Sequence, residues 1–532
     1  MEEQTALAPL LQLPGELILH VLSFLNVPQV LTVRQTCTLL KQITHSRSLW
    51  LIFLRRQQEA LPLPPRFSAP VDPRAPSESF AEPLTHLLES DVIRAHRIAR
   101  SWARPRIRGP TKLTPTPGDS LIILEIFLDR WLLCAYAEGF ACLWDLGASR
   151  SGSSAVRQTA RLDLQSKYWS SLTAALCPTC THVILALTCA STPGITEIHR
   201  VQLRPSASIY DPEWFELMHT LVSPVTQVAR TIEPASQLVV LSSTNAVEVV
   251  AVDMSASSPN GNGKVVESGM SISTHNDDLD ELLNSVVASR IMGPYIVLFK
   301  SRSIEMHPID AGSFHTLSTP KSHHGQVLKH HFASSSVTFR SLSSSDCVLT
   351  EEGLSFTFFG YDFLQGILHF DVSVRFMHSL SGDASLDVTC VGVYPMSGSI
   401  NMEALFPLRS SEPTLAQSPL TGIFEPRSRL PDGNVNSRGF VSAMALGPQG
   451  RRAVWIERKG GSLVRDVLVW SRSLPGTGQD GTGDVVIPRH VVYSVKSYDL
   501  REDLTHCAIG EVSGRIVLGN RAGDIFVLEV NY

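Results

Sequence analysis

The chain has 532 residues, of which 43% are hydrophobic and 18% are charged. With 45 basic and 50 acidic residues, its formal charge is −5. This composition is ordinary for a globular protein with a sizeable core, and it gives no electrostatic reason to bind nucleic acid over the whole surface. No stretch reaches the roughly 18 consecutive apolar residues of a transmembrane helix, and the acidic N-terminus does not resemble a signal peptide. We therefore expect no nucleic-acid partner, no membrane partner, and a cytoplasmic or nuclear location.

The cysteines support a reducing compartment. They are nine in number, and their spacing does not suggest a disulfide framework. Cys177 and Cys180 are separated by two residues, with His182 close by, a pattern compatible with half of a zinc site or a redox pair. No second Cys-x-x-Cys follows, so the ordinary interpretation is a turn between strands. We expect no metal ion, no cofactor and no catalytic residues, and hence a protein that is not an enzyme.

The chain divides by composition. Residues 1–10 form an N-terminal tail, 11–57 a Leu-rich helical unit, 58–81 a Pro-rich linker, and 82–105 a second helical segment. Residues 82–105 carry an apolar stripe at helical spacing, with Arg94, Arg97 and Arg100 beside it. These arginines favour a solvated helix face over a nucleic-acid patch.

From residue 115 to 532 the pattern is all-β. Seven pairs of apolar runs, each joined by a short turn, begin at residues 131, 183, 237, 295, 354, 452 and 515. Repeated units at such spacing predict a β-propeller of about seven blades, and a possible further strand pair at 386–408 leaves the number open by one. Segments near 254–285, 409–437 and 473–485 are rich in Pro, Gly and Ser, and we expect them to be mobile loops. The predicted fold is thus multidomain α plus all-β.

The helical unit carries more apolar surface than its size can bury. In the first helix, Leu17, Val21, Phe24 and Leu25 form one stripe, and Ile18 and Leu22 form a second stripe beside it. About forty residues cannot hide both stripes. The surplus predicts either a partner protein docked on this face or packing against the rest of the chain, and the Pro-rich linker favours the partner.

The same residues resemble the F-box family. The matching series is Leu13-Pro14-x-Glu16-Leu17, Val21-Leu22, Leu25, Leu31, Arg34, Cys37, Ile43 and Leu49-Trp50, with Leu40 at a position where the family often has Trp. The resemblance implies binding to a Skp-type adaptor and, through it, to the cullin scaffold of an SCF ubiquitin ligase. It also implies that the adaptor contacts come from Leu13, Pro14, Leu17, Val21, Leu22, Leu25 and Leu31.

The β region resembles a divergent WD-repeat propeller at the hairpin 131–146, which ends in Trp144-Asp145, and again at 515–530. An F-box joined to such a propeller implies the substrate-recognition subunit of an SCF-type ligase, whose propeller binds a target protein that the sequence does not identify. The alternative is a non-catalytic scaffold whose F-box binds the adaptor outside ligase assembly.

Overall fold

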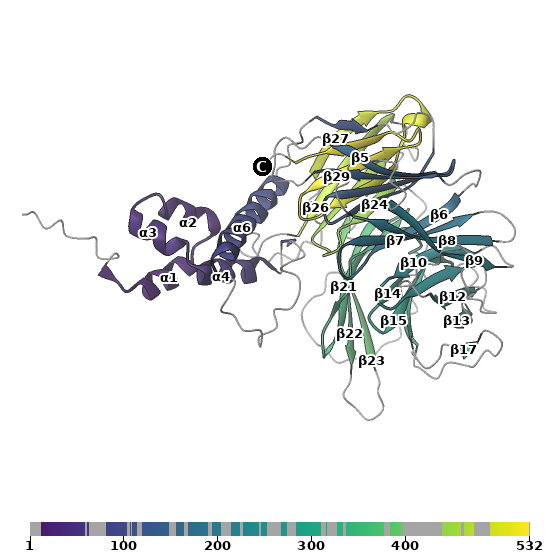
Figure 1. Ribbon diagram of the computed structural model, residues 1–532, viewed down its shortest axis with the longest axis horizontal. Helices are drawn as coiled ribbons and strands as arrows, with labels where there is room; N and C mark the ends of the chain where they lie inside the picture. The colour runs from purple at the N-terminus through teal and green to yellow at the C-terminus, as the bar shows by residue number, and fades with distance from the viewer. Residues whose placement is uncertain are drawn as a thin grey trace, which may run out of the picture.

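The computed structural model has an N-terminal group of helices and a large ring of β-sheets, which the helix α6 joins (Figure 1). The residues it describes are 12–58, 61–62, 81–103, 107, 109–113, 120–147, 156–163, 169–189, 194–203, 214–223, 227–243, 246–252, 268–273, 284–309, 315–316, 327–332, 337–376, 384–394, 396, 439–458, 462–472 and 490–530. The predicted multidomain α plus all-β fold is confirmed. No helix within the described ranges is both long enough and apolar enough to cross a membrane.

Four helices form the helical domain, which we define as residues 12–58. They are α1 (Gly15–Ser23), α2 (Val27–Val33), α3 (Thr38–Thr44) and α4 (Arg47–Gln58). The long helix α6 (Ala81–Ala103) follows. Leu88 and Val92 of α6 belong to the same apolar core as the helical domain, so the first part of α6 completes that domain.

The described strands form seven sheets, each a blade of four or five antiparallel strands. Blade 1 is β2–β5 (Leu121–Phe127, Trp131–Tyr136, Phe140–Asp145, Arg157–Asp163), and blade 2 is β6–β9 (Trp169–Leu176, His182–Cys189, Gly194–Gln202, Phe215–Ser223). Blade 3 is β10–β13 with β17 (Val228–Glu233, Leu238–Ser242, Ala246–Ala251, Ser268–Ser273, His315–Thr316). Blade 4 is β14–β16 with β18 (Val286–Met292, Tyr295–Lys300, Ser303–Pro308, Leu328–His331).

The remaining blades follow the same order. Blade 5 is β19–β23 (Phe339–Ser344, Val348–Leu349, Gly353–Asp362, Gly366–Phe376, Ala384–Tyr394) and blade 6 is β24–β27 (Phe440–Leu446, Arg452–Arg458, Val464–Ser471, His490–Lys496). Blade 7 is β28–β30 (Leu504–Gly510, Arg515–Asn520, Ile525–Leu528) with β1 (Thr111–Leu113). A short 3₁₀ helix (Leu500–Glu502) precedes β28.

The ring is closed by packing and by strand pairing. The first strands of successive blades contact one another in the order β2, β6, β10, β14, β19, β24 and β28, and β28 contacts β2 again. Each pair of neighbouring blades shares its own apolar core, including the pair formed by blades 7 and 1. The N-terminal strand β1 is the outer strand of the C-terminal blade, with Leu113 opposite Ile525. The chain therefore forms a seven-blade β-propeller, in which no blade is left as an open edge of the ring.

All seven predicted hairpins are confirmed, and each is the second and third strand of a blade. Most side chains of these strands are buried because both strand faces pack against neighbouring blades, although some are polar, such as Glu197 and His199 in β8. Residues 386–394 are not part of an additional blade, since they belong to β23, the outer strand of blade 5. The segment 401–408 lies outside the described residues.

One predicted loop is wrong in part. Within 254–285, Ser268–Ser273 form β13, where Met270 and Ile272 are buried in the core between blades 3 and 4. This segment is a strand because every second side chain is apolar and β12 pairs with it along its length. The segments 409–437 and 473–485, and most of the Pro-rich linker, lie outside the described residues.

Candidate functional site

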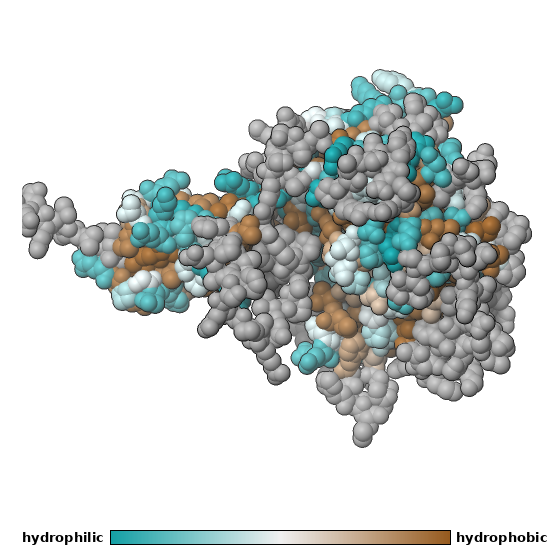
Figure 2. Space-filling model, viewed as in Figure 1, coloured by the Kyte–Doolittle hydropathy of each residue, from teal (hydrophilic) through white to brown (hydrophobic). Residues whose placement is uncertain are grey.

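Helix α1 presents one apolar stripe to the surface and buries the other. The side chains of Leu17, Val21 and Phe24 are 49%, 45% and 70% exposed, whereas Ile18 and Leu22 are 2% and 3% exposed. Residues at i, i+4 and i+7 lie on one helix face, so the three exposed side chains are neighbours. On the helical domain in Figure 2, hydrophobic surface lies among polar side chains.

The seven predicted adaptor-contact residues divide by burial. Leu13, Pro14, Leu17 and Val21 are exposed, and Leu25 and Leu31 are partly buried. Leu22 lies in the core of the helical domain, facing the other helices rather than solvent. Phe24 was not among the predicted contacts, yet it is the most exposed of the apolar side chains on α1. We define the α1 face as Leu13, Leu17, Val21 and Phe24.

Local capping sets the path of the chain after α1. Pro14 is the N-cap of α1, and its carbonyl oxygen accepts hydrogen bonds from the N–H groups of Leu17 and Ile18. Asn26 and Gln29 form a capping box at the start of α2, with side-chain to backbone bonds of 3.0 and 2.9 Å. Such reciprocal caps satisfy the free N–H groups at a helix start. The turns between the short helices are thus fixed by polar residues outside the apolar stripes.

A partly buried polar network joins the helical domain to α6. Glu89 of α6 is paired with the guanidinium of Arg34 and, at 2.9 Å, with His45 Nδ1. Arg34 also donates from Nε to Thr44 Oγ1 at 3.0 Å, and Trp50 Nε1 donates to Thr44 O at 2.8 Å. With Leu88 and Val92 in the same core, these contacts hold the first half of α6 against α3 and α4.

The other end of α6 is held by the propeller. Ile98 and Trp102 are each 1% exposed and lie in the core between blades 6 and 7. The guanidinium of Arg452 lies 5.0 Å from the centre of the Trp102 ring, and its Nη1 donates to Glu511 O at 2.6 Å. Burial lowers the pKa of Arg452 to about 10, so this side chain is still a cation at neutral pH. One helix therefore packs into both domains.

The two faces of the ring follow from the topology. Because the strands are antiparallel, turns between first and second strands lie on one face and turns between second and third strands on the other. Trp102 lies at the turn between β28 and β29, the first and second strands of blade 7, so α6 approaches the first of these faces. We call it the α6 face and the other one the far face.

The far face carries exposed apolar side chains from three neighbouring connections. These are Phe363 and Leu364 between β21 and β22, Leu463 between β25 and β26, and Tyr498 and Leu500 between β27 and β28. Leu463 and the last connection lie side by side, since Ser497 N–H donates to Leu463 O at 2.9 Å. Large exposed apolar side chains that gather on one face are a feature of protein-binding surfaces.

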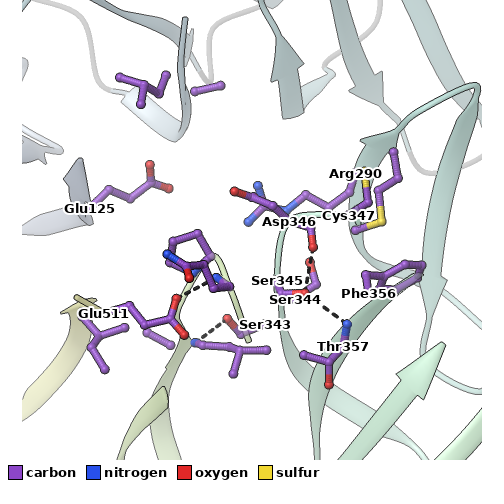
Figure 3. A pocket seen from close by; sticks show the side chains of 18 of the residues that line it. Glu125, Arg290, Ser343, Ser344, Ser345, Asp346, Cys347, Phe356, Thr357 and Glu511 are labelled. Carbon is purple, nitrogen blue, oxygen red and sulfur yellow. Dashed lines mark hydrogen bonds between the residues drawn. The ribbon is translucent and has the colours of Figure 1, made fainter. Parts of the chain in front are cut away.

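A cavity of about 1420 Å³ lies at the centre of the ring and extends to the turns of the α6 face. Glu125, Arg290 and Asp346 project into it from three blades (Figure 3). Burial raises the pKa of Glu125 to about 7, and the nearby Arg290 opposes this shift. Glu511, which also lines the cavity, accepts backbone N–H groups of Gln449 and Arg452 and so links blade 7 to blade 6.

The Cys-x-x-Cys pattern lies at the turn between β6 and β7. Cys177 is buried, Cys180 is exposed, and His182 begins β7. Among the described residues, no group of three or more Cys, His, Asp or Glu side chains is placed to hold a metal ion. The observed arrangement is the inter-strand turn that the sequence favours.

Comparison with known families identifies the helical domain. Residues 10–54 match the family described as F-box-like, which confirms the F-box predicted from Leu13 to Trp50. No curated protein matches the chain.

Several solved β-propellers are similar to the chain in overall fold. The β-propeller domain of Cps50 (Swd1) from Myceliophteria thermophila has 9% identity and a TM-score of 0.42, over 80% of this chain and 100% of that one. The C-terminal WD40 domain of Sif2 has 8% identity and a TM-score of 0.39, over 79% and 99%. The WD40 β-propeller domain of Doa1 has 10% identity and a TM-score of 0.37, over 80% and 97%. Similarity this low carries no functional argument, and the propeller assignment rests on the seven sheets themselves.

Proposed function

We propose that this chain, an F-box-like domain followed by a seven-blade β-propeller, is the substrate-recognition subunit of an SCF-type ubiquitin ligase. The F-box-like domain binds a Skp-type adaptor, and the adaptor connects it to a cullin scaffold. The propeller binds the target protein. Both kinds of domain are typically non-catalytic interaction domains, and other subunits supply the ubiquitin-transfer chemistry.

The observation that carries the proposal is the α1 face. Its four apolar side chains are 40% to 70% exposed although α6 already packs against the same helical domain. Covering them removes apolar surface from water at roughly 25 cal/mol per Å². A helical adaptor that lays its own apolar side chains against α1 is the partner that fits this face. In this proposal the adaptor touches Leu13, Pro14, Leu17, Val21 and Phe24. Contacts at the edge come from Leu25 and Leu31, and Leu22 supports α1 from inside the helical domain.

The position of α6 supports a ligase role over a simple pair of tethered domains. Because α6 is anchored in the helical domain through Glu89 and in the propeller through Trp102, the adaptor-binding face and the propeller keep a fixed separation. A rigid bridge raises the effective concentration of a bound target near the transfer enzyme. The far face, with its exposed Leu463, Tyr498 and Leu500, is our candidate for the target-binding surface.

The adaptor contact is tested with the full chain co-expressed with a Skp-type adaptor. We expect co-purification from the wild type and its loss from a Leu17→Asp/Val21→Asp double variant, because two carboxylates would be buried unpaired at the interface. Leu500→Asp is the matched control, since it places the same charge on an exposed leucine of the far face. Adaptor binding by the double variant at wild-type strength would refute this interface.

A second measurement separates ligase assembly from a scaffold role. Proteins captured by the propeller are quantified in cells that carry the full chain or a chain lacking residues 1–57. Accumulation of a captured partner after the deletion supports the ligase. Unchanged turnover of every captured partner, with adaptor binding intact in the full chain, supports the scaffold.

A further inference from the structure

Cys177 and Cys180 are placed at the two ends of one tight turn. Cys180 N–H donates to Cys177 O at 2.9 Å, and Cys177 N–H donates to His182 O at 3.0 Å. A turn closed by such an i to i+3 bond holds its end Cα atoms within about 7 Å, and a disulfide needs about 4.4 to 6.8 Å. The turn therefore holds the two cysteines at a Cα separation close to that of a disulfide.

The backbone at Cys180 has a conformation that cysteine rarely adopts. Its φ is +57°, in the left-handed region that favours glycine. A non-glycine residue held there is strained, because its Cβ crowds the backbone. The turn therefore keeps a thiol at a position where glycine would be favoured by the backbone.

The sulfur of Cys177 lies among one backbone N–H group and two hydroxyl groups that can form hydrogen bonds with it. His182 N–H donates to it at 3.3 Å, and the hydroxyl oxygens of Thr179 and Thr181 lie 3.1 and 3.7 Å from it. Burial disfavours the thiolate of Cys177, but the hydrogen bonds from Thr179, His182 and Thr181 outweigh it, so the pKa of this thiol is lowered. Donors around a sulfur stabilise the thiolate, which is the form that attacks disulfides.

The partner thiol is the accessible one. Cys180 is exposed and lies at the rim of the central cavity, whereas Cys177 is 3% exposed. Partial burial and the neighbouring Cys177 raise the pKa of Cys180, so its reaction with an external disulfide should accelerate as the pH rises above 7. An exposed first thiol beside a buried second thiol, whose ionised form is favoured by the hydrogen bond from His182 N–H, is the arrangement of a two-step exchange site.

We propose that Cys177 and Cys180 are a thiol–disulfide exchange site that closes to an intramolecular disulfide when it meets a small-molecule disulfide such as oxidised glutathione. Deprotonated Cys180 attacks one glutathione sulfur, the glutathione disulfide bond breaks, and one glutathione thiolate leaves. The Cys177 thiolate then attacks the Cys180 sulfur and expels the second glutathione thiolate. The two cysteines lose two electrons and the oxidised glutathione gains them, while the protons of both cysteine thiols pass, through solvent, to the two glutathione thiolates that leave. This site is independent of the adaptor and target proposed above.

The test uses the full chain exposed to oxidised glutathione. Free thiols are then alkylated in denaturant with a light reagent, disulfides are reduced, and the released thiols are alkylated with a heavy reagent. Cys177, Cys180 and Cys189 lie in one tryptic peptide, residues 168–200, which makes the buried Cys189 an internal control. We expect heavy label on Cys177 and Cys180 together and light label on Cys189.

Variants separate the two steps. Cys177→Ser should accumulate the glutathione adduct on Cys180, and Cys180→Ser should leave Cys177 free. Because Cys177→Ser alters a buried position, Thr179→Val/Thr181→Val provides an independent test. Without these hydroxyls, formation of the internal disulfide should slow by about three- to tenfold. The thiolate fraction of Cys177 falls, and the higher nucleophilicity of the remaining thiolate offsets only part of that loss.

Three results would overturn the proposal. One is light label on both cysteines after exposure to oxidised glutathione. Another is a wild-type protein that keeps the glutathione adduct without forming the internal disulfide. The last is protection of both thiols that a chelator, but not a reductant, removes, since that behaviour indicates a metal site.

Discussion

Trp102, near the end of α6, lies directly against Gly514 in the turn between β28 and β29. A Cβ atom on Gly514 would come within 2.6 Å of Trp102 Nε1, and the φ of Gly514 is +74°. Both the left-handed backbone and the contact therefore require glycine here. The turn between β28 and β29 therefore leaves room for the Trp102 ring to pack against Gly514.

Replacing Trp102 by alanine should detach the end of α6 from the propeller. Its ring is 1% exposed, so we expect a loss of about 3 to 5 kcal/mol in the free energy of unfolding. Hydrogen–deuterium exchange should increase at the end of α6 while adaptor binding stays intact. Trp102→Phe is the matched control, because the indole Nε1 has no hydrogen-bond partner among the described residues and most of the ring packing is kept. Equal exchange in both variants would contradict the anchoring role.

Leu17 and Ile18, adjacent on α1, should respond in opposite ways to the same substitution. Ile18→Asp places a carboxylate in the core of the helical domain and should unfold that domain, which circular dichroism and proteolysis would detect. Leu17→Asp should leave the fold and the helix content unchanged and reduce adaptor affinity alone. A Leu17→Asp variant that unfolds would indicate that the α1 face is part of the core rather than a binding surface.

Much of the fold could be predicted because the second and third strands of each blade carry apolar runs that are buried between neighbouring blades. The first strands could not, because one end of each lines the central cavity and mixes exposed and buried side chains, as in Val228–Glu233. The closing strand Thr111–Leu113 is also too short to produce a pattern. Ring closure depends on a contact between the two ends of the propeller, and the local pattern of apolar residues does not predict a contact between residues so far apart in the sequence.

The apolar stripes of α1 could be predicted from the sequence, but the exposure of each side chain could not. Both stripes of α1 are apolar, and the sequence alone does not decide which one the other helices cover. The predicted contacts therefore include Leu22, which is buried, and omit Phe24, which is 70% exposed. The Asn26–Gln29 capping box, which orients α2, could have been recognised from the spacing of these two residues.

Acid should destabilise the propeller through His369. The Thr357 hydroxyl donates to Phe370 O at 2.8 Å, so it can only accept from His369 Nε2 at 2.8 Å. His369 Nδ1 is buried and has no hydrogen-bond partner within the described part of the chain. Burial lowers the pKa of His369 to about 4, with Asp371 opposing and Arg472 adding to the shift. The neutral ring is therefore the form that the fold accepts.

The sign of the pH effect follows from that lowered pKa. Between pH 7 and 5 the unfolded chain gains a proton at this histidine and the folded chain does not, so the free energy of unfolding falls by about 2 kcal/mol from this group. Urea unfolding of the wild type and of His369→Phe at both pH values measures the difference. The variant should lose about 2 kcal/mol less than the wild type on acidification. Identical losses in the two proteins would show that His369 is protonated within the fold.

Closure of the ring should depend strongly on Leu113 and only weakly on the adjacent Lys112. Leu113 is 6% exposed in the core between blades 7 and 1, whereas the ion pair of Lys112 with Asp524, at 2.9 Å, has its lysine half exposed. We expect Leu113→Ala to reduce the free energy of unfolding by about 2 to 4 kcal/mol, and Lys112→Ala by less than about 1 kcal/mol. Limited proteolysis should cut first beside the loosened strand in Leu113→Ala. Equal stability of the two variants would mean that β1 does not hold the seventh blade, because the buried leucine would then contribute no more than an exposed charge.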